Sequence, residues 1–365
     1  EAVEQVYSGN SAEVLNAVDS RSISVAMLTS TKAMCCFRNA STTYLNAVVV
    51  NYGSSSGSVA VVNAEATVDV AVAAQANNQA TVIYKTSTGV TKGYVLDISG
   101  NNITPGSVAT IDSGTGGSGT AITALSSTQL LCVYQGASPG TPKERILDIS
   151  GSAITPSSEV AADGTNCAAT HLRVGKISAT KALVCFRNAT GNKIRARLQS
   201  VSVSTPSATG SALEFSAMPG TSPSLQFGVI ILSTTRALVV TGIDRTYSDV
   251  MILLVDISST TPVLLRTKTI RVNGSGSLDI AATKIDANTA FVAWTGGGSL
   301  GVDSIIVKAS SDDNIFVSAV CDKLESSIEA SNGYLDVAAL DSTHVVQLCR
   351  NSSTYLSAKV IELAA

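Results

Sequence analysis

Short apolar runs alternate with clusters of Gly, Ser, Asn and Pro along the whole chain, and no stretch sustains a 3.6-residue apolar period. Between residues 120 and 162, the runs "TAITALSS", "QLLCVYQ", "KERILDIS" and "AITPSSEVAA" follow one another with turn residues between them. Apolar runs of this length, bounded by turn signals, predict β-strands joined by hairpins. The pattern therefore predicts a succession of groups of four short strands.

Two phrases occur twice with small changes. "TKAMCCFRNAS" (31–41) returns as "TKALVCFRNAT" (180–190), and "VLDISGNNITPGS" (95–107) returns as "ILDISGSAITPSS" (146–158). Weaker copies of the first phrase fill the gaps, and successive copies are 47 to 55 residues apart. The residues that close the seven apolar runs are Phe37, Tyr84, Tyr134, Phe186, Thr241, Trp294 and Cys349. Seven units of about 50 residues therefore cover the chain, as in a repeat architecture.

The second run of each unit, such as "ALVCF" or "LLCVY", is apolar at every position, which indicates a strand buried on both faces. Four antiparallel strands repeated radially make a β-propeller blade, in which neighbouring blades provide that double burial. A β-helix is the alternative, but these units are too long for its usual coil. The sequence therefore predicts an all-β protein, a seven-bladed β-propeller of four-stranded antiparallel blades, forming one domain over residues 1–365.

The turn between the third and fourth runs has Gly100 in one unit and Gly151 in the next, and Gly tolerates the positive φ of tight hairpins. Pro105 and Pro156 follow early in the fourth run. Because proline cannot donate a ladder hydrogen bond, it belongs on an edge strand. The fourth strand is therefore predicted to be the outer edge of each blade.

The two ends of the chain complement each other. The seventh unit ends after its third strand, Tyr355–Leu363, whereas the N-terminus has a spare strand at Val3–Gly9. We expect residues 3–9 to pair with Tyr355–Leu363, complete the last blade and close the ring, which removes an open sheet edge.

Composition narrows the class of protein. Charged residues make up 14% and apolar residues 45% of the chain, whereas soluble domains carry about 25% charged residues. Much of the chain is therefore expected to be buried or to face other protein. The apolar runs are strand-sized, far below the roughly 20 residues of a membrane-spanning helix, so no membrane insertion is predicted. A net charge of −3 without a basic stripe argues against nucleic-acid binding. The first ten residues lack the pattern of a signal peptide, although one could have been removed.

Seven cysteines and two histidines occur without any CxxC pair, so neither a metal site nor another cofactor is predicted. Most cysteines lie in apolar runs and are expected to be core residues. Cys167 and Cys321 have more polar surroundings. The alternative for these two is an intermolecular disulfide, which would suit a durable extracellular assembly.

Basic residues directly follow the second run in units one, two, four and seven, at Arg38, Lys85, Arg187 and Arg350. Equivalent positions of a propeller lie on one face, and Arg350, Arg38 and Lys85 would form an arc once the ring closes. Guanidinium groups suit carboxylates and phosphates, so one hypothesis is a docking surface for an acidic glycan or a partner protein. The alternative is that each side chain hydrogen-bonds carbonyls of its own hairpin or a nearby Asp.

Catalytic signatures are weak. Sialidase repeats need Asp-box turns with tryptophan, and Trp294, the sole tryptophan, lies in a predicted core strand. Glycoside hydrolysis needs two opposed carboxylates, yet the one acidic cluster, "SDDN" (311–314), falls in a predicted turn. His171 and His344 are present, but no G-x-S-x-G elbow surrounds a serine. We therefore predict that the protein is not an enzyme.

The repeat unit resembles the degenerate propeller repeats of bacteriophage virion proteins and of some secreted bacterial proteins. "CFRNAS", "CFRNAT", "LCRNSS" and the segments Gly100–Thr104 and Gly151–Thr155 carry the resemblance. It implies a non-enzymatic component exposed on a virion or outside the cell, such as a tail fibre, adhesin or decoration protein. Its partners would be other virion or surface-assembly proteins, together with a host surface glycan. The alternative is a carbohydrate-binding propeller lectin, which would stack sugars on exposed tyrosines such as Tyr44, Tyr247, Tyr334 and Tyr355.

Overall fold

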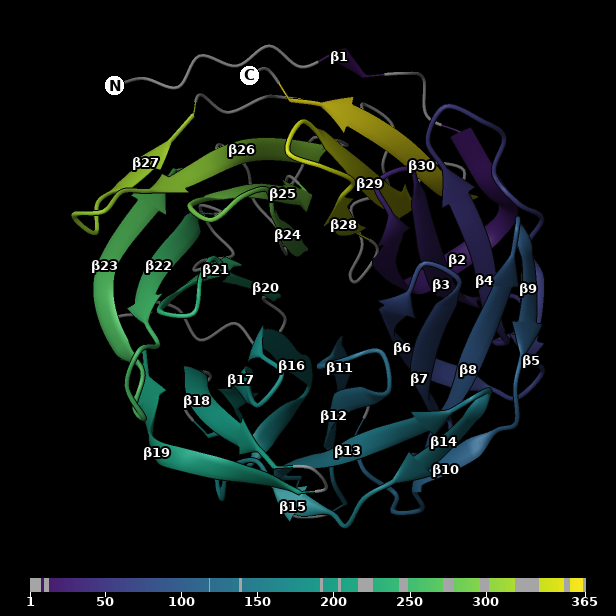
Figure 1. Ribbon diagram of the computed structural model, residues 1–365, viewed down its shortest axis with the longest axis horizontal. Coiled ribbons are helices and arrows are strands. Elements are labelled where there is room, and N and C mark those ends of the chain that lie inside the picture. Colours follow the sequence, from purple (N-terminus) through teal and green to yellow (C-terminus); the bar gives the residue numbers. More distant parts are fainter. Residues whose placement is uncertain are drawn as a thin grey trace. The chain divides into compact units, whose positions relative to one another are not determined.

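The computed structural model shows an all-β protein, and its fold class is the predicted seven-bladed β-propeller of four-stranded antiparallel sheets (Figure 1). It describes residues 8–9, 13–117, 119–137, 140–190, 193–202, 205–215, 226–242, 249–271, 279–295, 302–318, 335–350 and 355–363. None of these residues is helical, so no described helix is long and apolar enough to cross a membrane. The chain divides into two compact units, and the prediction of one domain over residues 1–365 stays a prediction.

One unit comprises Ser22–Phe215 and Thr260–Pro262, and it contains sheets one to four. Within each sheet the strands follow chain order from one edge to the other, as the teal strands of sheet four show (Figure 1). The bounds are, for sheet one, β2 (Glu13–Thr29), β3 (Lys32–Asn39), β4 (Leu45–Asn51) and β5 (Ala60–Asn63); for sheet two, β6 (Thr67–Ala76), β7 (Gln79–Thr86), β8 (Thr91–Ser99), β9 (Asn102–Pro105) and β10 (Ala109–Asp112); for sheet three, β11 (Thr120–Ala124), β12 (Gln129–Gln135), β13 (Pro142–Ser150), β14 (Ala153–Pro156) and β15 (Val160–Ala161); for sheet four, β16 (Cys167–Ser178), β17 (Lys181–Asn188), β18 (Ile194–Val201) and β19 (Pro206–Glu214).

The other unit contains sheets five to seven. The bounds are, for sheet five, β20 (Phe227–Ile231), β21 (Arg236–Gly242), β22 (Val250–Asp256) and β23 (Val263–Ile270); for sheet six, β24 (Ile280–Lys284), β25 (Thr289–Thr295), β26 (Val302–Ala309) and β27 (Ile315–Val317); for sheet seven, β28 (Leu335–Ala339), β29 (His344–Arg350), β30 (Tyr355–Glu362) and the first half of β2, with β1 (Ser8–Gly9) also paired to β30.

Among the described residues, the N-terminal segment pairs antiparallel with β30 at Ser8 and Gly9, within the predicted range, and also further along the chain. Ser8 and Gly9 lie opposite Glu362 and Ile361, and the longer pairing runs over residues 13–19. Residues 3–7 of the predicted strand lie outside the described residues. The further pairing arises because β2 is one continuous strand, whose first half pairs in sheet seven and whose second half belongs to sheet one.

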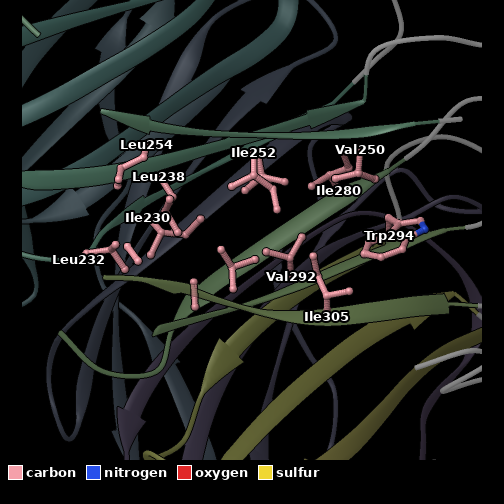
Figure 2. Packing of buried hydrophobic residues seen from close by; sticks show 14 residues of the cluster. Ile230, Leu232, Leu238, Val250, Ile252, Leu254, Ile280, Val292, Trp294 and Ile305 are labelled. Carbon is pink, nitrogen blue, oxygen red and sulfur yellow. The ribbon is translucent and has the colours of Figure 1, made fainter. Parts of the chain in front are cut away.

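The second strand of each sheet is buried at nearly every position, as its unbroken apolar sequence predicts. In β7, for example, each residue after Gln79 is buried. Figure 2 shows the resulting core between sheets five and six, a cluster that includes Ile230, Ile252, Ile305 and Trp294. Trp294 is fully buried there, which confirms its predicted place in a core strand.

The fourth strands of sheets two and three are each split into two pieces. Pro105 ends the first piece in sheet two and Pro156 ends it in sheet three, and both pieces pair with the same third strand. The prolines lie at the sheet edge, as expected from their missing N–H.

The repeated turn joins neighbouring sheets. Gly100 and Gly151 have φ of +61° and +58°, the left-handed region that favours glycine. Lys32 Nζ donates to the Gly100 carbonyl at 2.9 Å, and Gln79 Nε2 donates to the Gly151 carbonyl at 3.2 Å. Each donor begins the second strand of the preceding sheet. The recurrence of the phrase therefore reflects a recurring contact between sheets.

Candidate functional site

The four basic positions singled out in the sequence lie at or near the ends of second strands, Arg38 in β3, Lys85 in β7 and Arg187 in β17 in one unit and Arg350 in β29 in the other. Lys85, Arg187 and Arg350 are buried, with exposed fractions of 0%, 2% and 5%. Because a docking surface needs accessible cations, a ligand there would have to reach side chains that the protein itself now surrounds. The docking hypothesis stays a prediction.

Lys85 links two sheets. Its Nζ donates to the Gln135 carbonyl of sheet three at 2.7 Å and lies 5.5 Å from the centre of the Tyr134 ring. Burial lowers the pKa of this lysine. Gln135, the equivalent residue of sheet three, donates from Nε2 to the Cys167 carbonyl of sheet four at 2.8 Å. At these two positions the contacts favour the structural alternative, with the acceptor in the next sheet.

The six cysteines among the described residues are all buried, as expected for core residues. Cys167 donates from Sγ to the Gly140 carbonyl at 3.0 Å, and burial raises the pKa of its thiol to about 12. A disulfide to another chain would require this thiol to leave its position, and Cys321 lies outside the described residues. The intermolecular disulfide stays a prediction.

The acidic turn at residues 311–314 is held by a neighbouring sheet. Arg236 at the start of β21 donates to the Ser311 carbonyl at 2.7 Å, also contacts the Ser310 carbonyl, and lies 2.7 Å from Asp313 Oδ1. His344 Nδ1 lies 3.0 Å from Asp341 within its own turn. These contacts give both features a structural role.

Sequence inspection did not single out the third strands, yet three consecutive sheets carry related polar clusters there. In each, the aromatic residue that closes the apolar run of the second strand lies directly opposite a cation of the third strand. The pairs are Tyr84 with Lys92, Tyr134 with Lys143, and Phe186 with Arg195. A carboxylate completes each cluster.

In sheet two the polar groups satisfy one another. Lys92 Nζ lies 2.8 Å from Glu65 Oε2, and Asn63 Nδ2 donates to the Tyr84 hydroxyl at 2.6 Å. The hydroxyl in turn lies 3.5 Å from Glu65 Oε2. The hydrogen bond from Lys92 lowers the pKa of Glu65. The Tyr84 hydroxyl therefore supplies hydrogen-bond partners for this cluster from inside the protein, and we call such a cluster closed.

Sheet three is closed in the same way. The Tyr134 hydroxyl donates to Glu159 Oε2 at 2.7 Å and accepts a hydrogen bond from Arg145 Nε at 3.0 Å. Lys143 Nζ lies 3.1 Å from Glu159 Oε1. The tyrosine hydroxyl thus bridges a cation and a carboxylate.

Sheet four has more charge. Arg197 NH1 and Arg195 NH2 lie 3.1 and 3.5 Å from Asp163 Oδ2, and the Asp163 side chain is 4% exposed. Arg195 NH1 also lies 3.4 Å from Glu214 Oε2, whose other oxygen lies 3.2 Å from Lys193 Nζ. Asp163 therefore forms ion pairs with both Arg195 and Arg197, and Glu214 forms a second ion pair with Arg195.

Several buried polar atoms of this cluster have no hydrogen-bond partner among the described residues. They are Nε of Arg195 and of Arg197, Oε1 of Gln199, and both carboxyl oxygens of Glu144, which projects from β13 of sheet three. Glu144 is fully buried, and burial raises the pKa of its carboxyl to about 8 despite the nearby charge of Arg197. The side chains of both arginines are 23% exposed, so the cluster reaches solvent. The cluster therefore contains both hydrogen-bond donors and hydrogen-bond acceptors that have no partner among the described residues.

The signal for this cluster was present in the sequence. "IRARLQ" places Arg195, Arg197 and Gln199 at alternate positions, hence on one face of a strand. Glu144 stands in "KERILDIS", just before the apolar residues of that run. Which face meets which carboxyl depends on the packing of sheet three against sheet four.

No protein-family model and no curated protein matches this chain. Among solved structures, the BP39L lectin from Burkholderia pseudomallei has a TM-score of 0.66 at 11% identity, covering 95% of this chain and 98% of that one. The Aleuria aurantia lectin, a six-bladed β-propeller that recognises fucose, has a TM-score of 0.51 at 12% identity, covering 84% and 97%. A protein of unknown function from Dyadobacter fermentans has a TM-score of 0.55 at 9% identity, covering 98% and 99%. Identities this low show a shared fold, which by itself does not carry function.

Proposed function

We propose that this chain is a non-enzymatic carbohydrate-binding propeller, and that the cluster of sheet four is where it binds. The observation that carries the proposal is the set of buried donors and acceptors without partners at Arg195, Arg197, Gln199 and Glu144. Buried polar groups are normally hydrogen-bonded, so unmet ones in and beside two partly exposed arginines indicate a ligand that supplies the missing partners. Propeller lectins share the fold, which supports the choice of ligand class.

A sugar fits this cluster better than a simple anion. Each hydroxyl both donates and accepts, and the cluster offers guanidinium donors next to carboxyl and amide oxygens. The charges of Arg195 and Arg197 are already partly neutralised by Asp163 and Glu214. An anion would be drawn to the arginines but would meet these carboxylates as well, whereas a neutral polyol satisfies both kinds of group.

The location of the protein and its partners are separate from the class of ligand. Virion partners and a bacteriophage origin have no support from the lectin structures, and a location on a virion or outside the cell stays a prediction. A host glycan as ligand agrees with the proposal made above.

The test is titration calorimetry with the α-methyl glycosides of fucose, mannose, galactose and glucose. We expect one of them to bind the wild-type chain, and Arg197→Ala to weaken it at least about tenfold, since a hydrogen bond to a charged group contributes about 1.5–3 kcal/mol. Arg266→Ala, at an exposed position of β23, is the control and should leave affinity unchanged. Absence of binding to every glycoside, or equal affinity of the Arg197→Ala variant with an unchanged thermal midpoint, would contradict the proposal.

A further inference from the structure

The aromatic residue of the three clusters differs by one hydroxyl group. Tyr84 and Tyr134 close the apolar runs of the second strands in sheets two and three, and Phe186 occupies the same register position in sheet four. Phe186 is fully buried. Its ring belongs to the apolar core between sheets three and four, with Val133 and Val184. A phenylalanine here fills the space of a tyrosine ring but provides no hydrogen-bonding group.

Arg145 and Arg197 show what the missing hydroxyl does. They occupy equivalent positions, because Arg145 lies opposite Cys132 and Arg197 lies opposite Val184, each two residues before the closing aromatic. Arg145 Nε donates to the Tyr134 hydroxyl at 3.0 Å. Arg197 Nε is buried and has no such acceptor among the described residues. The same donor is therefore satisfied internally in one sheet and left open in the next.

We propose that a hydroxyl group of the bound sugar takes, in sheet four, the place that the Tyr134 hydroxyl takes in sheet three. It accepts the hydrogen bond of Arg197 Nε and donates to a carboxyl oxygen of the cluster, as the tyrosine hydroxyl donates to Glu159. Of these three sheets, only sheet four then binds ligand. This inference rests on the proposed function.

The internal hydrogen bonds of the two tyrosine hydroxyls explain why sheets two and three do not bind the sugar. In each, a ligand hydroxyl would have to displace the Tyr84 or Tyr134 hydroxyl from hydrogen bonds of 2.6 to 3.0 Å within the protein. Exchanging one hydrogen bond for an equivalent one gives little net free energy. In sheet four the ligand instead satisfies groups whose lack of a partner already costs stability, so the same hydroxyl gains more there.

Glu144 adds the second acceptor. It is fully buried and within electrostatic reach of Arg197, and the other charged groups of the cluster are Arg195, Asp163 and Glu214. Lys193 and the exposed edges of both arginines border the cluster on the solvent side. A neutral sugar ring at the exposed edges of the two arginines has adjacent hydroxyl groups for Arg197 Nε and for Glu144, and it reaches these buried atoms when the side chains around them move.

The test is Phe186→Tyr, which supplies the hydroxyl from within the protein. For the methyl glycoside that the wild-type chain binds, we expect at least about a tenfold loss of affinity, with a thermal midpoint equal to or above that of wild type. Phe37→Tyr is the matched control, because Phe37 is equally buried at the same register in sheet one but lies opposite Asn46 and not a cation. That variant should keep wild-type affinity.

A second pair keeps the test decisive if Phe186→Tyr does not fold. Arg197→Lys keeps the charge but removes Nε, and should also lose about tenfold. Arg145→Lys makes the same change in the closed cluster and should lose nothing. Full affinity of Phe186→Tyr or of Arg197→Lys, or an equal loss in Arg145→Lys, overturns this inference while leaving a carbohydrate-binding protein. Failure of the wild-type chain to bind any of the four glycosides overturns the proposed function, and this inference with it.

Discussion

At the scale of single residues, Glu144 is a carboxyl whose surroundings disfavour its charged form. It is fully buried between sheets three and four, and neither carboxyl oxygen has a hydrogen-bond partner among the described residues. Burial in a low-dielectric setting penalises the charged form, so the pKa of Glu144 rises from 4.5 to about 8. A carboxyl in this position destabilises the fold whenever it has to ionise.

This predicts a pH dependence with a definite sign. Because the folded pKa lies above the unfolded value, the folded state holds its proton longer, and stability falls as pH rises from 4.5 to about 8. Glu144→Gln removes the ionisation. We expect the variant to exceed wild type by about 1–3 kcal/mol at pH 8.5 and by much less at pH 4.5. Urea unfolding across this pH range measures the difference.

Glu159→Gln is the control with the opposite sign. Burial raises the pKa of Glu159, but hydrogen bonds from Tyr134 and Lys143 outweigh burial and lower the pKa overall. A carboxylate with a lowered pKa stabilises the fold at neutral pH and loses that contribution in acid. Glu159→Gln should therefore be less stable than wild type near neutral pH. Parallel pH profiles for the two variants would contradict the assignment of Glu144 as the destabilised group.

At the scale of elements, the glycines on either side of β9 meet two different constraints. Gly106 begins the gap between β9 and β10, and a Cβ built on it would lie 2.2 Å from the Ser152 carbonyl oxygen of sheet three. Gly100 has a positive φ, but a Cβ on it would meet nothing within 4 Å. Glycine is thus required at one position by close approach and at the other by backbone conformation.

Alanine at the two glycines should have different effects. Gly100→Ala is expected to cost about 1 kcal/mol, the penalty for the left-handed conformation. Gly106→Ala forces backbone of two sheets apart and is expected to cost more, about 2–3 kcal/mol. Urea unfolding of both variants provides the comparison. An equal or smaller loss for Gly106→Ala would show that the two sheets can separate there at little cost.

At the scale of the whole molecule, the two ends of the chain are paired. β30 has β29 on one side and the first half of β2 on the other, through residues 13–19, while β1 adds two further pairs. Without residues 13–19 the β30 edge would expose backbone donors and acceptors, which is a template for aggregation.

Truncation of the N-terminus tests this pairing. Removal of residues 1–19 should lower the thermal midpoint by several degrees and increase aggregation in size-exclusion chromatography, because β30 loses its partner. Removal of residues 1–9 eliminates the two described pairs of β1 and should have a smaller effect. Similar behaviour of the two truncations would show that residues 13–19 contribute little.

Much of the architecture could be predicted from sequence because it depends on local signals. Turn residues at regular spacing and unbroken apolar runs such as β7 predicted strand number, sheet composition and the buried second strands. Of the N-terminal pairing, the part at Ser8 and Gly9 was predicted, whereas the longer part over residues 13–19 was not. Nothing local distinguishes residues 3–9 from residues 13–19 as partners of β30, since either can be extended and the choice depends on where the rest of the sheet places the chain.

The candidate site could not be predicted from local sequence signals, for a related reason. Lys85 attracted attention as a cation at a repeated position, but the fold buries it against the Gln135 carbonyl of the next sheet. Arg197 was inconspicuous as one of several basic residues, and its meaning depends on groups from other elements. Asp163 fixes its guanidinium, Glu144 faces it from sheet three, and Phe186 leaves its Nε without an acceptor.

The sequence by itself determined that this protein is a propeller of seven similar sheets, because hydrophobic period, turn chemistry and repeat length act over a few residues at a time. The tertiary structure alone decided which of three similar clusters remains open. Tyr134 and Phe186 differ by one hydroxyl, and that difference matters only where packing brings a buried arginine Nε and a buried carboxyl to the same place. Hydrogen-bond satisfaction is a property of neighbours in space, and the chain order does not contain it.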